Sequence, residues 1–398
     1  MNKLPTRKIW LITEHFAPSH GATAQLMGDL AYGLVSRGIP VTVLTATAAN
    51  PKFNNDLPVG LEVIRLSNNL DDSKKVFNKI KKGILFLVGA FAWGVFYGRT
   101  GQQIFIASNP PFIGLLGPLL KLKGMSYIFI FQDLFPRSAV LSGVLPAVGP
   151  ITSFWRLIMA FICKNSKYTV VLNKAMLKRL TRDFGDKINA VSIHNWAVEQ
   201  ALPISRAENK FSAELGISRF FIVQYSGNFG RMHDLLTLLE AARLLEDAPI
   251  RFLFIGDGSK INQIISYLDV LRLSNIVKMP YQCRSRLPES LGACDISVIG
   301  LIPGAEDTVA PCKFYGILAS GRPVLLIARR NCDLAQLVIS ENIGVVVEPG
   351  EAYELSQVLR ALQLDPDRVL LMGCRARYLY ESRFGKERSI DQYALLLD

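Results

Sequence analysis

The residues that most clearly suggest chemistry lie between Ala310 and Ile327. Lys313 stands in the first turn of a predicted short helix, which is followed by a Gly-Arg-Pro turn at 321–323 and an apolar strand. The first backbone N–H groups of a helix have no partner within it and attract anions, and a lysine there adds a full positive charge. This stretch therefore predicts a phosphate ligand, although a solvated lysine at an ordinary helix start fits the same residues.

Strands and helices alternate along the chain, which predicts parallel α/β sheets. A strand at 8–13, a helix at about 23–37 and a strand at 41–45 form one βαβ unit with a right-handed crossover. Ligands bind such sheets where the strands end, and the loop that ends at Gly21 must lie there. The Gly-x-Gly-x-x-Gly dinucleotide pattern is absent, which counts against an ordinary dehydrogenase.

The same alternation occurs in both halves of the chain. Polar sequence predicts irregular structure from about Ala46 to Lys75, and a connection between the halves at Ala197–Ser218. Two successive α/β domains follow from this pattern. Further strands are predicted at 104–107, 127–131, 169–172, 190–193, 220–225, 251–255, 276–279, 295–299, 324–327 and 344–347.

The composition indicates which kinds of molecule the protein binds. The 398 residues include 45 Lys and Arg against 33 Asp and Glu, a formal charge of +12, which suits nucleotide or lipid phosphates. Neither zinc-type Cys/His spacing nor a nucleic-acid-binding motif is present, so no nucleic-acid partner is expected. The six cysteines are scattered and the polar N-terminus runs straight into a strand, so we expect a cytoplasmic protein without a secretory signal.

An apolar run, Ile84–Tyr97, follows the basic residues Lys79, Lys81 and Lys82 and precedes Arg99. As a helix it spans roughly 20 Å, less than the ~30 Å hydrocarbon core of a bilayer. A helix buried in the protein core and a helix lying in the interface of an anionic membrane both fit this pattern.

The order and spacing of these segments resemble the GT-B glycosyltransferases of family 4. Within that family the chain looks most similar to bacterial surface-polysaccharide enzymes, the N-acetyl-fucosamine and colanic-acid-type transferases. The segments that carry the resemblance are Glu14–Pro18 with Gly21, Gln132–Pro136, Asn195 with Trp196, Tyr225–Gly230, Phe254–Gly258, Ala293–Ile296 and Pro311–Val324.

The resemblance implies two Rossmann-like domains that face an interdomain cleft. Residues 1–200 would bind the acceptor, residues 201–380 would bind a nucleotide-sugar, and a C-terminal helix in 381–398 would pack back toward the N-terminal domain. The implied activity is that of a retaining hexosyltransferase, independent of metal or other cofactors. It would move a sugar from a nucleotide-sugar, UDP-linked by expectation, to a lipid-linked saccharide.

The implied setting is O-antigen, capsule or exopolysaccharide assembly, peripheral on the inner face of the cell membrane. A GT-B nucleotide-sugar epimerase or hydrolase is an alternative, although four histidines supply such chemistry poorly. A nucleotide-sugar-binding protein without catalytic activity is another alternative.

The resemblance and the residue chemistry together give the candidate site residues. Cations and preorganised N–H groups stabilise a departing diphosphate, and a carboxylate can orient or deprotonate an acceptor. Helix capping by Asp133 and a solvated Glu306 are the ordinary alternatives. The candidates are Asp133 and Glu306 for catalysis, Gly21, Gly227, Asn228, Arg231 and Lys313 for the donor phosphates, and His15 and His20 for the acceptor.

The chain also departs from the family pattern. Many members have two glutamates eight positions apart, and Thr308 and Gly316 occupy those positions here. The second glutamate commonly holds the donor ribose, so that contact must be made otherwise or be absent. The arginine–lysine pair expected after the strand that ends at Tyr225 is also altered, with Asn228 and His233 near those places.

Overall fold

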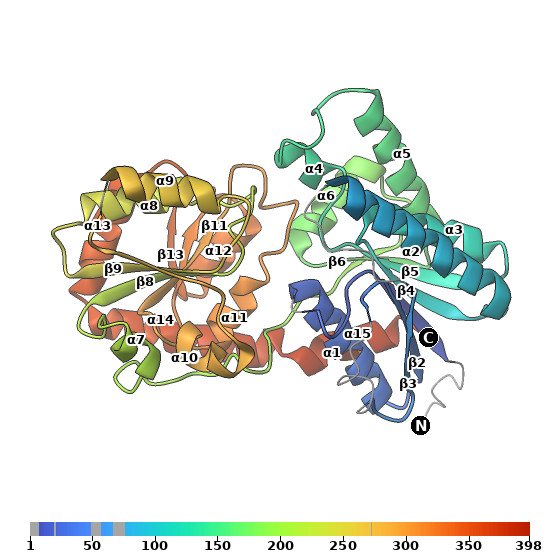
Figure 1. Ribbon diagram of the computed structural model, residues 1–398, viewed down its shortest axis with the longest axis horizontal. Helices are drawn as coiled ribbons and strands as arrows, with labels where there is room; N and C mark the ends of the chain where they lie inside the picture. Colours follow the sequence, from blue (N-terminus) through green and yellow to red (C-terminus); the bar gives the residue numbers. More distant parts are fainter. Residues whose placement is uncertain (1–7, 20, 49–56, 67–75, 272) are drawn as a thin grey trace. The chain divides into compact units, whose positions relative to one another are not determined.

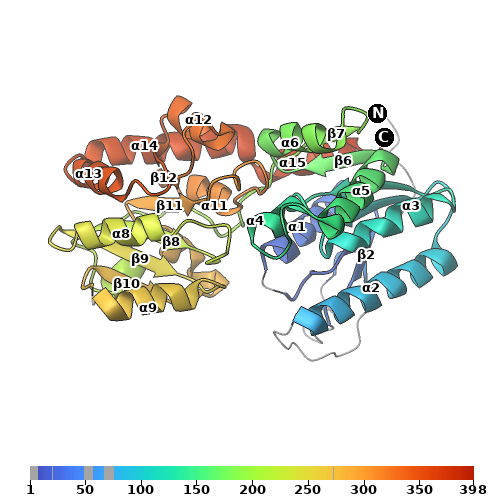
Figure 2. The same ribbon diagram turned by 90° about the horizontal axis from the view of Figure 1, so that it is seen from above.

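The computed structural model describes residues 8–19, 21–48, 57–66, 76–271 and 273–398 and divides into two compact units. Unit 1 contains the chain up to Asn195 together with Thr308–Ala310 and Lys386–Asp398. Unit 2 contains Trp196–Asp307 and Pro311–Gly385. Each unit is built on a parallel sheet with helices on both faces (Figures 1 and 2), which confirms the expected α/β fold.

Unit 1 has a seven-stranded sheet in the order β3-β2-β1-β4-β5-β6-β7. Its strands are β1 (Ile9–Thr13), β2 (Val41–Thr45), β3 (Leu61–Arg65), β4 (Gln103–Ala107), β5 (Ser126–Ile130), β6 (Tyr168–Val171) and β7 (Ala190–Ser192). Its helices are α1 (Ala22–Ser36), α2 (Val76–Tyr97), α3 (Leu116–Lys121), α4 (Arg137–Leu141), α5 (Pro150–Asn165), α6 (Lys174–Phe184) and α15 (Lys386–Leu395), with a 3-10 turn at Pro111–Leu115.

Alternate residues of the central strands face different helices, as the period of a strand requires. Ile104 and Ile106 of β4 belong to the apolar cluster that includes residues of α2, α3 and α5. Phe105 points to the other face, where its ring meets the Tyr393 ring of α15 at a centroid distance of 5.9 Å. The C-terminal helix is therefore part of the core of unit 1.

One expectation of irregular structure was wrong. β3 lies within the stretch from Ala46 to Lys75, and it pairs with β2 along its whole length. Only Leu61 of β3 is buried, so this edge strand lacks the apolar run that marks the others. The stretch expected to connect the halves, Ala197–Ser218, holds the short helix α7 (Lys210–Glu214), whose Asn209 caps its first turn.

α2 is half-buried. Phe86 and Ala90 lie in the core, whereas Ile84, Val88 and Phe96 are exposed, Phe96 by 79%. In the described part of the chain, no helix combines the length and the apolar character that crossing a bilayer requires.

Unit 2 has a six-stranded sheet in the order β10-β9-β8-β11-β12-β13. Its strands are β8 (Phe221–Ser226), β9 (Ile250–Ile255), β10 (Ile276–Met279), β11 (Ile296–Gly300), β12 (Val324–Ile327) and β13 (Gly344–Val347). Besides α7, its helices are α8 (Leu236–Leu244), α9 (Ile261–Leu271), α10 (Leu287–Leu291), α11 (Lys313–Ala319), α12 (Asp333–Ser340), α13 (Ala352–Gln363) and α14 (Pro366–Leu379), with a 3-10 turn at Arg284–Arg286 and a π-helical turn at Tyr380–Phe384.

The strand order of unit 2 reverses direction at β8, which pairs with β9 on one side and β11 on the other. Ligands of open parallel sheets bind at the carboxyl ends of the strands near such a reversal. The residues that follow β8 begin with Gly227, and those that follow β11 lead to Glu306 and then to Lys313. These three candidates therefore lie at the carboxyl ends of neighbouring strands of the sheet.

Candidate functional site

Lys313 is the first residue of α11, and its ammonium nitrogen is buried without a hydrogen-bond partner. Nζ lies 3.6 Å from the centroid of the Tyr225 ring, whose π-electrons attract a cation. Burial lowers the pKa of Lys313 to about 7. A buried ammonium without a hydrogen-bond acceptor is costly, so this position favours an incoming anion.

His233 lies on the other side of Tyr225. The Tyr225 hydroxyl lies 2.8 Å from His233 Nδ1, and the Gly230 N–H donates to the same nitrogen at 3.1 Å. The same nitrogen lies 2.9 Å from the Asn228 carbonyl oxygen. Burial and the nearby Lys313 lower the pKa of His233 to about 3. The histidine thus adds a polar group but no charge at neutral pH.

The loop after β8 packs tightly against the loop after β9. Gly227 has a φ of +127°, which favours glycine, and a side chain there would meet the end of Lys313. Gly256 has a φ of +136°, and a Cβ on it would collide with the Gly227 carbonyl. Asn228 lies exposed in this loop, and its carbonyl accepts a hydrogen bond from the Tyr225 hydroxyl at 2.9 Å. Arg231 is exposed at the end of the loop.

Glu306 is held by the protein itself. Its side chain is 2% exposed and accepts two hydrogen bonds of 3.0 Å from the Arg329 guanidinium. The Gly304 N–H donates to it at 2.7 Å and the Arg329 N–H at 3.3 Å. These partners occupy both carboxylate oxygens, so the geometry favours a role in anchoring the loop before α11 over the predicted catalytic role.

Three further candidates lie in unit 1. Gly21 precedes the first turn of α1, where a Cβ would meet no atom within 4 Å. His15 is exposed with its Nε2 3.7 Å from Glu14. Asp133 follows β5 in the loop that leads to α4, and its backbone forms an antiparallel bridge with Val309. His20 lies outside the described residues.

The structure therefore brings together Gly227, Asn228 and Lys313, with Arg231 at the end of the same loop. Glu306 lies at the carboxyl end of the same sheet, but its carboxylate is paired with Arg329. Gly21, His15 and Asp133 belong to the other unit. Among the described residues, no group of three or more His, Cys, Asp or Glu side chains is arranged to hold a metal ion.

Sequence reasoning missed two residues of this site. Tyr225 is predicted to end a strand and begins a segment that carries the family resemblance, but the sequence gives it no role in the site, although it touches both Lys313 and His233. Lys260 donates to the His233 carbonyl at 2.7 Å and so holds the loop in place. The position of an aromatic residue just before a Ser-Gly turn was the available signal for Tyr225.

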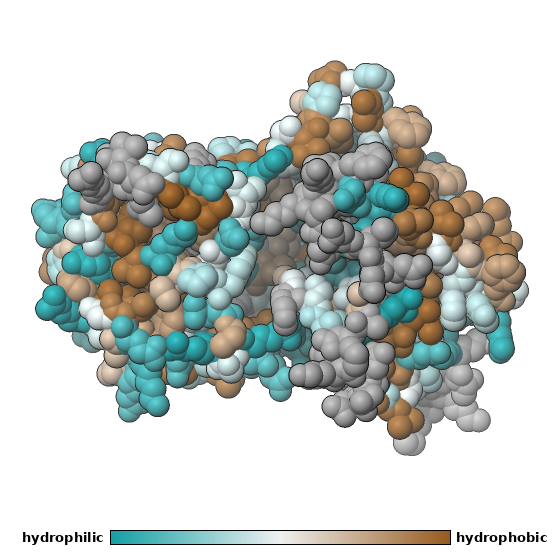
Figure 3. Space-filling view, viewed as in Figure 1, coloured by the Kyte–Doolittle hydropathy of each residue, from teal (hydrophilic) through white to brown (hydrophobic). Residues whose placement is uncertain are grey.

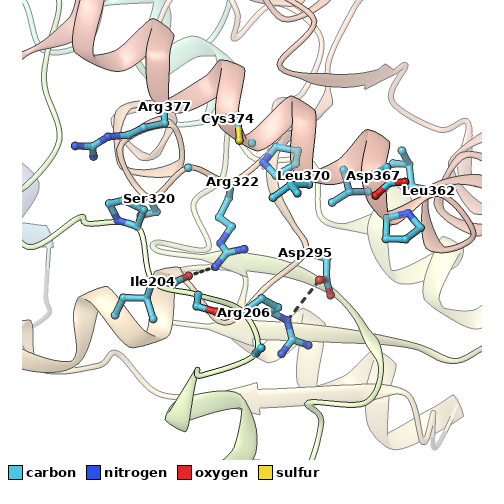
Figure 4. A pocket seen from close by; sticks show the side chains of 18 of the residues that line it. Ile204, Arg206, Asp295, Ser320, Arg322, Leu362, Asp367, Leu370, Cys374 and Arg377 are labelled. Atoms are coloured by element: carbon cyan, nitrogen blue, oxygen red, sulfur yellow. Dashed lines mark hydrogen bonds and ion pairs between the residues drawn. The ribbon is translucent and has the colours of Figure 1, made fainter.

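A separate cavity of about 810 Å³ lies at the amino ends of the strands of the same sheet, where Phe221 begins β8 and Asp295 precedes β11. Figure 4 shows Arg206 beside Asp295, at 3.4 Å, and Arg322 donating to the Ile204 carbonyl at 2.6 Å. Its lining residues do not include Lys313 or Tyr225, so the cavity is distinct from the Lys313 site.

Comparison with known proteins identifies the second half of the chain. Residues 207–377 match the family model of the glycosyl transferases group 1. The chain is 23% identical over 324 residues to the probable glycosyltransferase WbjE of Pseudomonas aeruginosa, covering 79% of this chain and 80% of WbjE. It is 28% identical over 287 residues to the putative colanic acid biosynthesis glycosyl transferase WcaI of Escherichia coli, covering 69% and 68%.

A solved structure supports the fold. Anabaena HepE, crystallised with UDP-glucose, matches with a TM-score of 0.74 at 14% identity over 98% of this chain and 99% of HepE. Together with the two parallel sheets, this likeness confirms the expected GT-B fold of two Rossmann-like domains. The chain is therefore a glycosyltransferase, and its residues 207–377 belong to the glycosyl transferases group 1 family.

Proposed function

We propose that this enzyme is a retaining hexosyltransferase of family 4 that uses a UDP-linked sugar. It transfers the sugar to a lipid-linked saccharide during O-antigen, capsule or exopolysaccharide assembly. The name of WcaI, a putative colanic acid biosynthesis enzyme, supports a polysaccharide product. The complex of HepE with UDP-glucose supports UDP as the nucleotide.

The observation that carries the proposal is the Lys313 ammonium. It is buried, has no hydrogen-bond partner, and lies beside Gly227, where a side chain would contact the end of the lysine. A diphosphate oxygen placed there supplies the missing acceptor and offsets the cost of the buried charge.

The reaction breaks the bond between the sugar's anomeric carbon and a diphosphate oxygen, and forms a bond from that carbon to an acceptor oxygen. The acceptor hydroxyl loses its proton, and the diphosphate leaves with an additional negative charge. Lys313 stabilises that charge in the transition state. A fixed cation of this kind replaces the metal ion that other transferases use, so no metal is required.

Thermal unfolding with UDP, GDP, ADP and their sugar conjugates tests the donor assignment. A ligand that binds the folded state raises the unfolding temperature, by an amount that grows with the logarithm of the ratio of its concentration to its Kd. We expect UDP and a UDP-sugar to stabilise the wild type and to have little effect on Lys313→Met. The matched control is Lys210→Met, an exposed lysine of unit 2, which should respond as the wild type does. Equal binding by Lys313→Met would disprove the site.

Product analysis separates the alternatives. Sugar released as free hexose without acceptor would indicate a hydrolase, and UDP binding without turnover of any lipid-linked acceptor would indicate a binding protein.

The proposed location is the cytoplasmic face of the cell membrane, with peripheral attachment. Recovery of the whole protein in the soluble fraction at low salt would contradict that attachment.

A further inference from the structure

The cavity of about 810 Å³ at the amino ends of the unit 2 strands, which we call the amino-end cavity, has the size of a small-molecule site. Such sites measure roughly 300–1,000 Å³ and combine an apolar lining with a few polar groups. All residues that line this cavity belong to unit 2, so one compact unit forms it. Lys313 and Tyr225 are not among them, so the proposed reaction gives the cavity no role.

Arg322 lines the amino-end cavity, and no carboxylate of the described residues lies within ion-pair distance of it. Its Nη2 donates to two neutral acceptors, the carbonyls of Ile204 at 2.6 Å and Gly292 at 2.8 Å. Its Nε is buried and has no hydrogen-bond partner. A guanidinium has five N–H donors, and a carboxylate or phosphate can accept from two of them at once. Arg322 therefore favours an oxyanion as its partner.

A second arginine and a single carboxylate complete this end of the cavity. Asp295 accepts a hydrogen bond from the Ile222 N–H at 2.7 Å and lies 3.4 Å from Arg206 Nε. Burial raises the pKa of Asp295, and the charges of Arg206 and Arg322 act against that rise. One carboxylate is therefore shared by two guanidinium groups, which Figure 4 shows together, and the surplus positive charge attracts an anion.

The two other acidic residues that line the cavity are paired elsewhere or hydrated. Glu381 pairs with Arg377 at 2.6 Å. Asp367 is exposed in the first turn of α14, where Figure 4 shows it beside Leu362, and water screens its charge. Neither carboxylate forms an ion pair with Arg322 in the described part of the chain.

The side of the cavity that α13 and α14 form is largely apolar. Leu362 and Val369 are buried, and Leu370 is 68% exposed at the rim. Exposed apolar side chains also occur over α2 and α3 of unit 1 (Figure 3), but here they adjoin a volume that arginines line. In the view of Figure 4, Arg322 lies between Leu370 and the pair of Arg206 with Asp295. A ligand with an apolar body and an anionic end matches this lining.

The amino-end cavity also touches the end of the helix that begins with Lys313. Residues 320–322 follow α11 directly, and all three line the cavity. The Arg322 N–H donates to the Ile317 carbonyl at 3.1 Å, so the turn continues the hydrogen bonding of the helix. α11 is roughly 10 Å long and mostly buried, and close-packed elements transmit strain. A shift of the turn therefore displaces Lys313 at the other end of the helix.

We propose that the amino-end cavity is an effector site for a small organic anion. The ligand places a carboxylate or phosphate on Arg322 and an apolar body against α14, and its binding changes the affinity of the Lys313 site for the donor. Such coupling is reciprocal, so the donor changes the affinity for the effector by the same factor. The inference rests on the proposed function in taking Lys313 as part of the donor site.

Calorimetry with three matched probes tests the ligand class. The probes are 2-naphthoate, 2-naphthyl phosphate and the neutral 2-naphthamide. We expect at least one of the anions to bind the wild type about tenfold more tightly than the amide. The tighter anion indicates whether the natural ligand is a carboxylate or a phosphate. Equal affinities for the amide and both anions would overturn the proposal.

Alkylation of Cys374 locates the bound probe. Cys374 is exposed and lines the cavity, whereas Cys283 is exposed and does not line it. A bound anionic probe should slow the reaction of N-ethylmaleimide with Cys374 and leave the reaction of Cys283 unchanged, as measured by peptide mass spectrometry. Binding without protection of Cys374 would place the probe elsewhere and overturn the assignment.

Two substitutions have matched controls in α14. Leu370→Glu adds a charge that repels the anion, and Leu371→Glu adds the same charge at an exposed neighbour outside the lining. Arg322→Gln removes the proposed anion-binding group, and Arg375→Gln removes an exposed charge outside the lining. The first member of each pair should weaken anion binding about tenfold, and its control by less than about twofold.

Equal losses in a variant and its control would overturn the proposal, because the substitutions would then act only through general charge. If Arg322→Gln does not fold, the comparison of Leu370→Glu with Leu371→Glu decides the question, since both positions are exposed.

The Kd of UDP-glucose with and without a saturating anionic probe tests the coupling. We expect a change of about fivefold or more in the wild type and in Leu371→Glu, and none in Leu370→Glu. Probe binding that leaves this Kd unchanged would overturn the effector role. Lys313→Met should lose UDP-glucose binding and keep the protection of Cys374. A wild type that shows this protection but does not bind UDP-glucose would instead mark a failure of the donor assignment.

Discussion

The Lys313 ammonium lies 3.6 Å from the centre of the Tyr225 ring, and the hydroxyl of the same tyrosine lies 2.8 Å from His233 Nδ1. One aromatic side chain therefore contacts both Lys313 and His233. Burial is the main cause that lowers the two pKa values, to about 7 for Lys313 and about 3 for His233. Near neutral pH, the lysine is the group whose charge responds to pH.

Donor binding should consequently depend on pH. A diphosphate binds the protonated lysine, and without ligand the protonated fraction falls tenfold per pH unit above a pKa of about 7. The Kd of a UDP-sugar should be constant below that pH and rise by up to about tenfold per unit above it. Isothermal titration calorimetry across this range, in buffers of different ionisation enthalpy, should also show that binding takes up a proton.

A UDP-sugar is preferred to UDP because its phosphates carry no terminal group that titrates near pH 6. Lys313→Met is the control, and it should bind weakly with no dependence on pH above neutrality. A wild-type Kd that stays constant up to the ordinary lysine pKa of about 10.4 would contradict the lowered pKa.

Most strands could be predicted because parallel strands are buried on both faces and appear as short apolar runs. β2 has five buried residues, and its bounds match the prediction. β3 has one, because it lies at the edge of the sheet, and its Leu-Glu-Val-Ile-Arg sequence resembles a loop. Apolar periodicity identifies buried elements and gives little signal at a half-exposed edge.

The candidate site could be predicted in part for a similar reason. Lys313 stands in a local motif that the sequence displays directly, whereas its contact with Tyr225 joins residues 88 positions apart in the numbering. The Glu306–Arg329 pair likewise depends on β11 and β12 being neighbours, because the loops that follow the two strands then meet at their carboxyl ends. Such contacts follow from strand order, which the pattern of apolar residues does not specify.

Removal of Arg329 should destabilise unit 2 more than neutralisation of Glu306. Arg329→Gln leaves a carboxylate that is 2% exposed without its cation, and breaking such a pair costs about 3–5 kcal/mol. Glu306→Gln leaves an arginine that is 46% exposed and can be hydrated, so its cost should be nearer to about 1–3 kcal/mol. Urea unfolding curves of the two variants measure the difference.

The double variant Arg329→Gln with Glu306→Gln provides the control for this pair. It should be more stable than Arg329→Gln alone, since no buried charge is left unpaired. If the two substitutions simply add, the pair does not interact as the geometry indicates. Retained sugar transfer by Glu306→Gln, once the protein is folded, would support its role as a loop anchor.

Gly316→Ala should stabilise the protein. Gly316 lies inside α11 with an ordinary helical backbone, and a Cβ there would meet no atom within 4 Å. Glycine inside a helix is less favourable than alanine by roughly 0.5–1 kcal/mol, so the free energy of unfolding should rise by about that amount. UDP binding should not change. The comparison is Gly117→Ala in α3, where the added Cβ would collide with the Tyr127 ring and should be destabilising.

Ile390→Ala should destabilise unit 1. Ile390 of α15 is fully buried and covers Gly33 of α1, where even a Cβ would collide with it, and Arg37 fixes the same helix through a 2.7 Å ion pair with Asp391. Truncation of a buried isoleucine to alanine costs about 2–5 kcal/mol.

Tryptophan fluorescence during urea unfolding can measure this loss, because three of the chain's four tryptophans, Trp10, Trp93 and Trp155, lie in unit 1. Leu395→Ala is the matched control in the same helix. Its side chain is 68% exposed, so its effect should stay within about 0.5 kcal/mol. Equal unfolding midpoints for the two variants would show that α15 does not contribute to the core of unit 1. A lower midpoint for Ile390→Ala alone would show that the last helix stabilises the first unit of the chain.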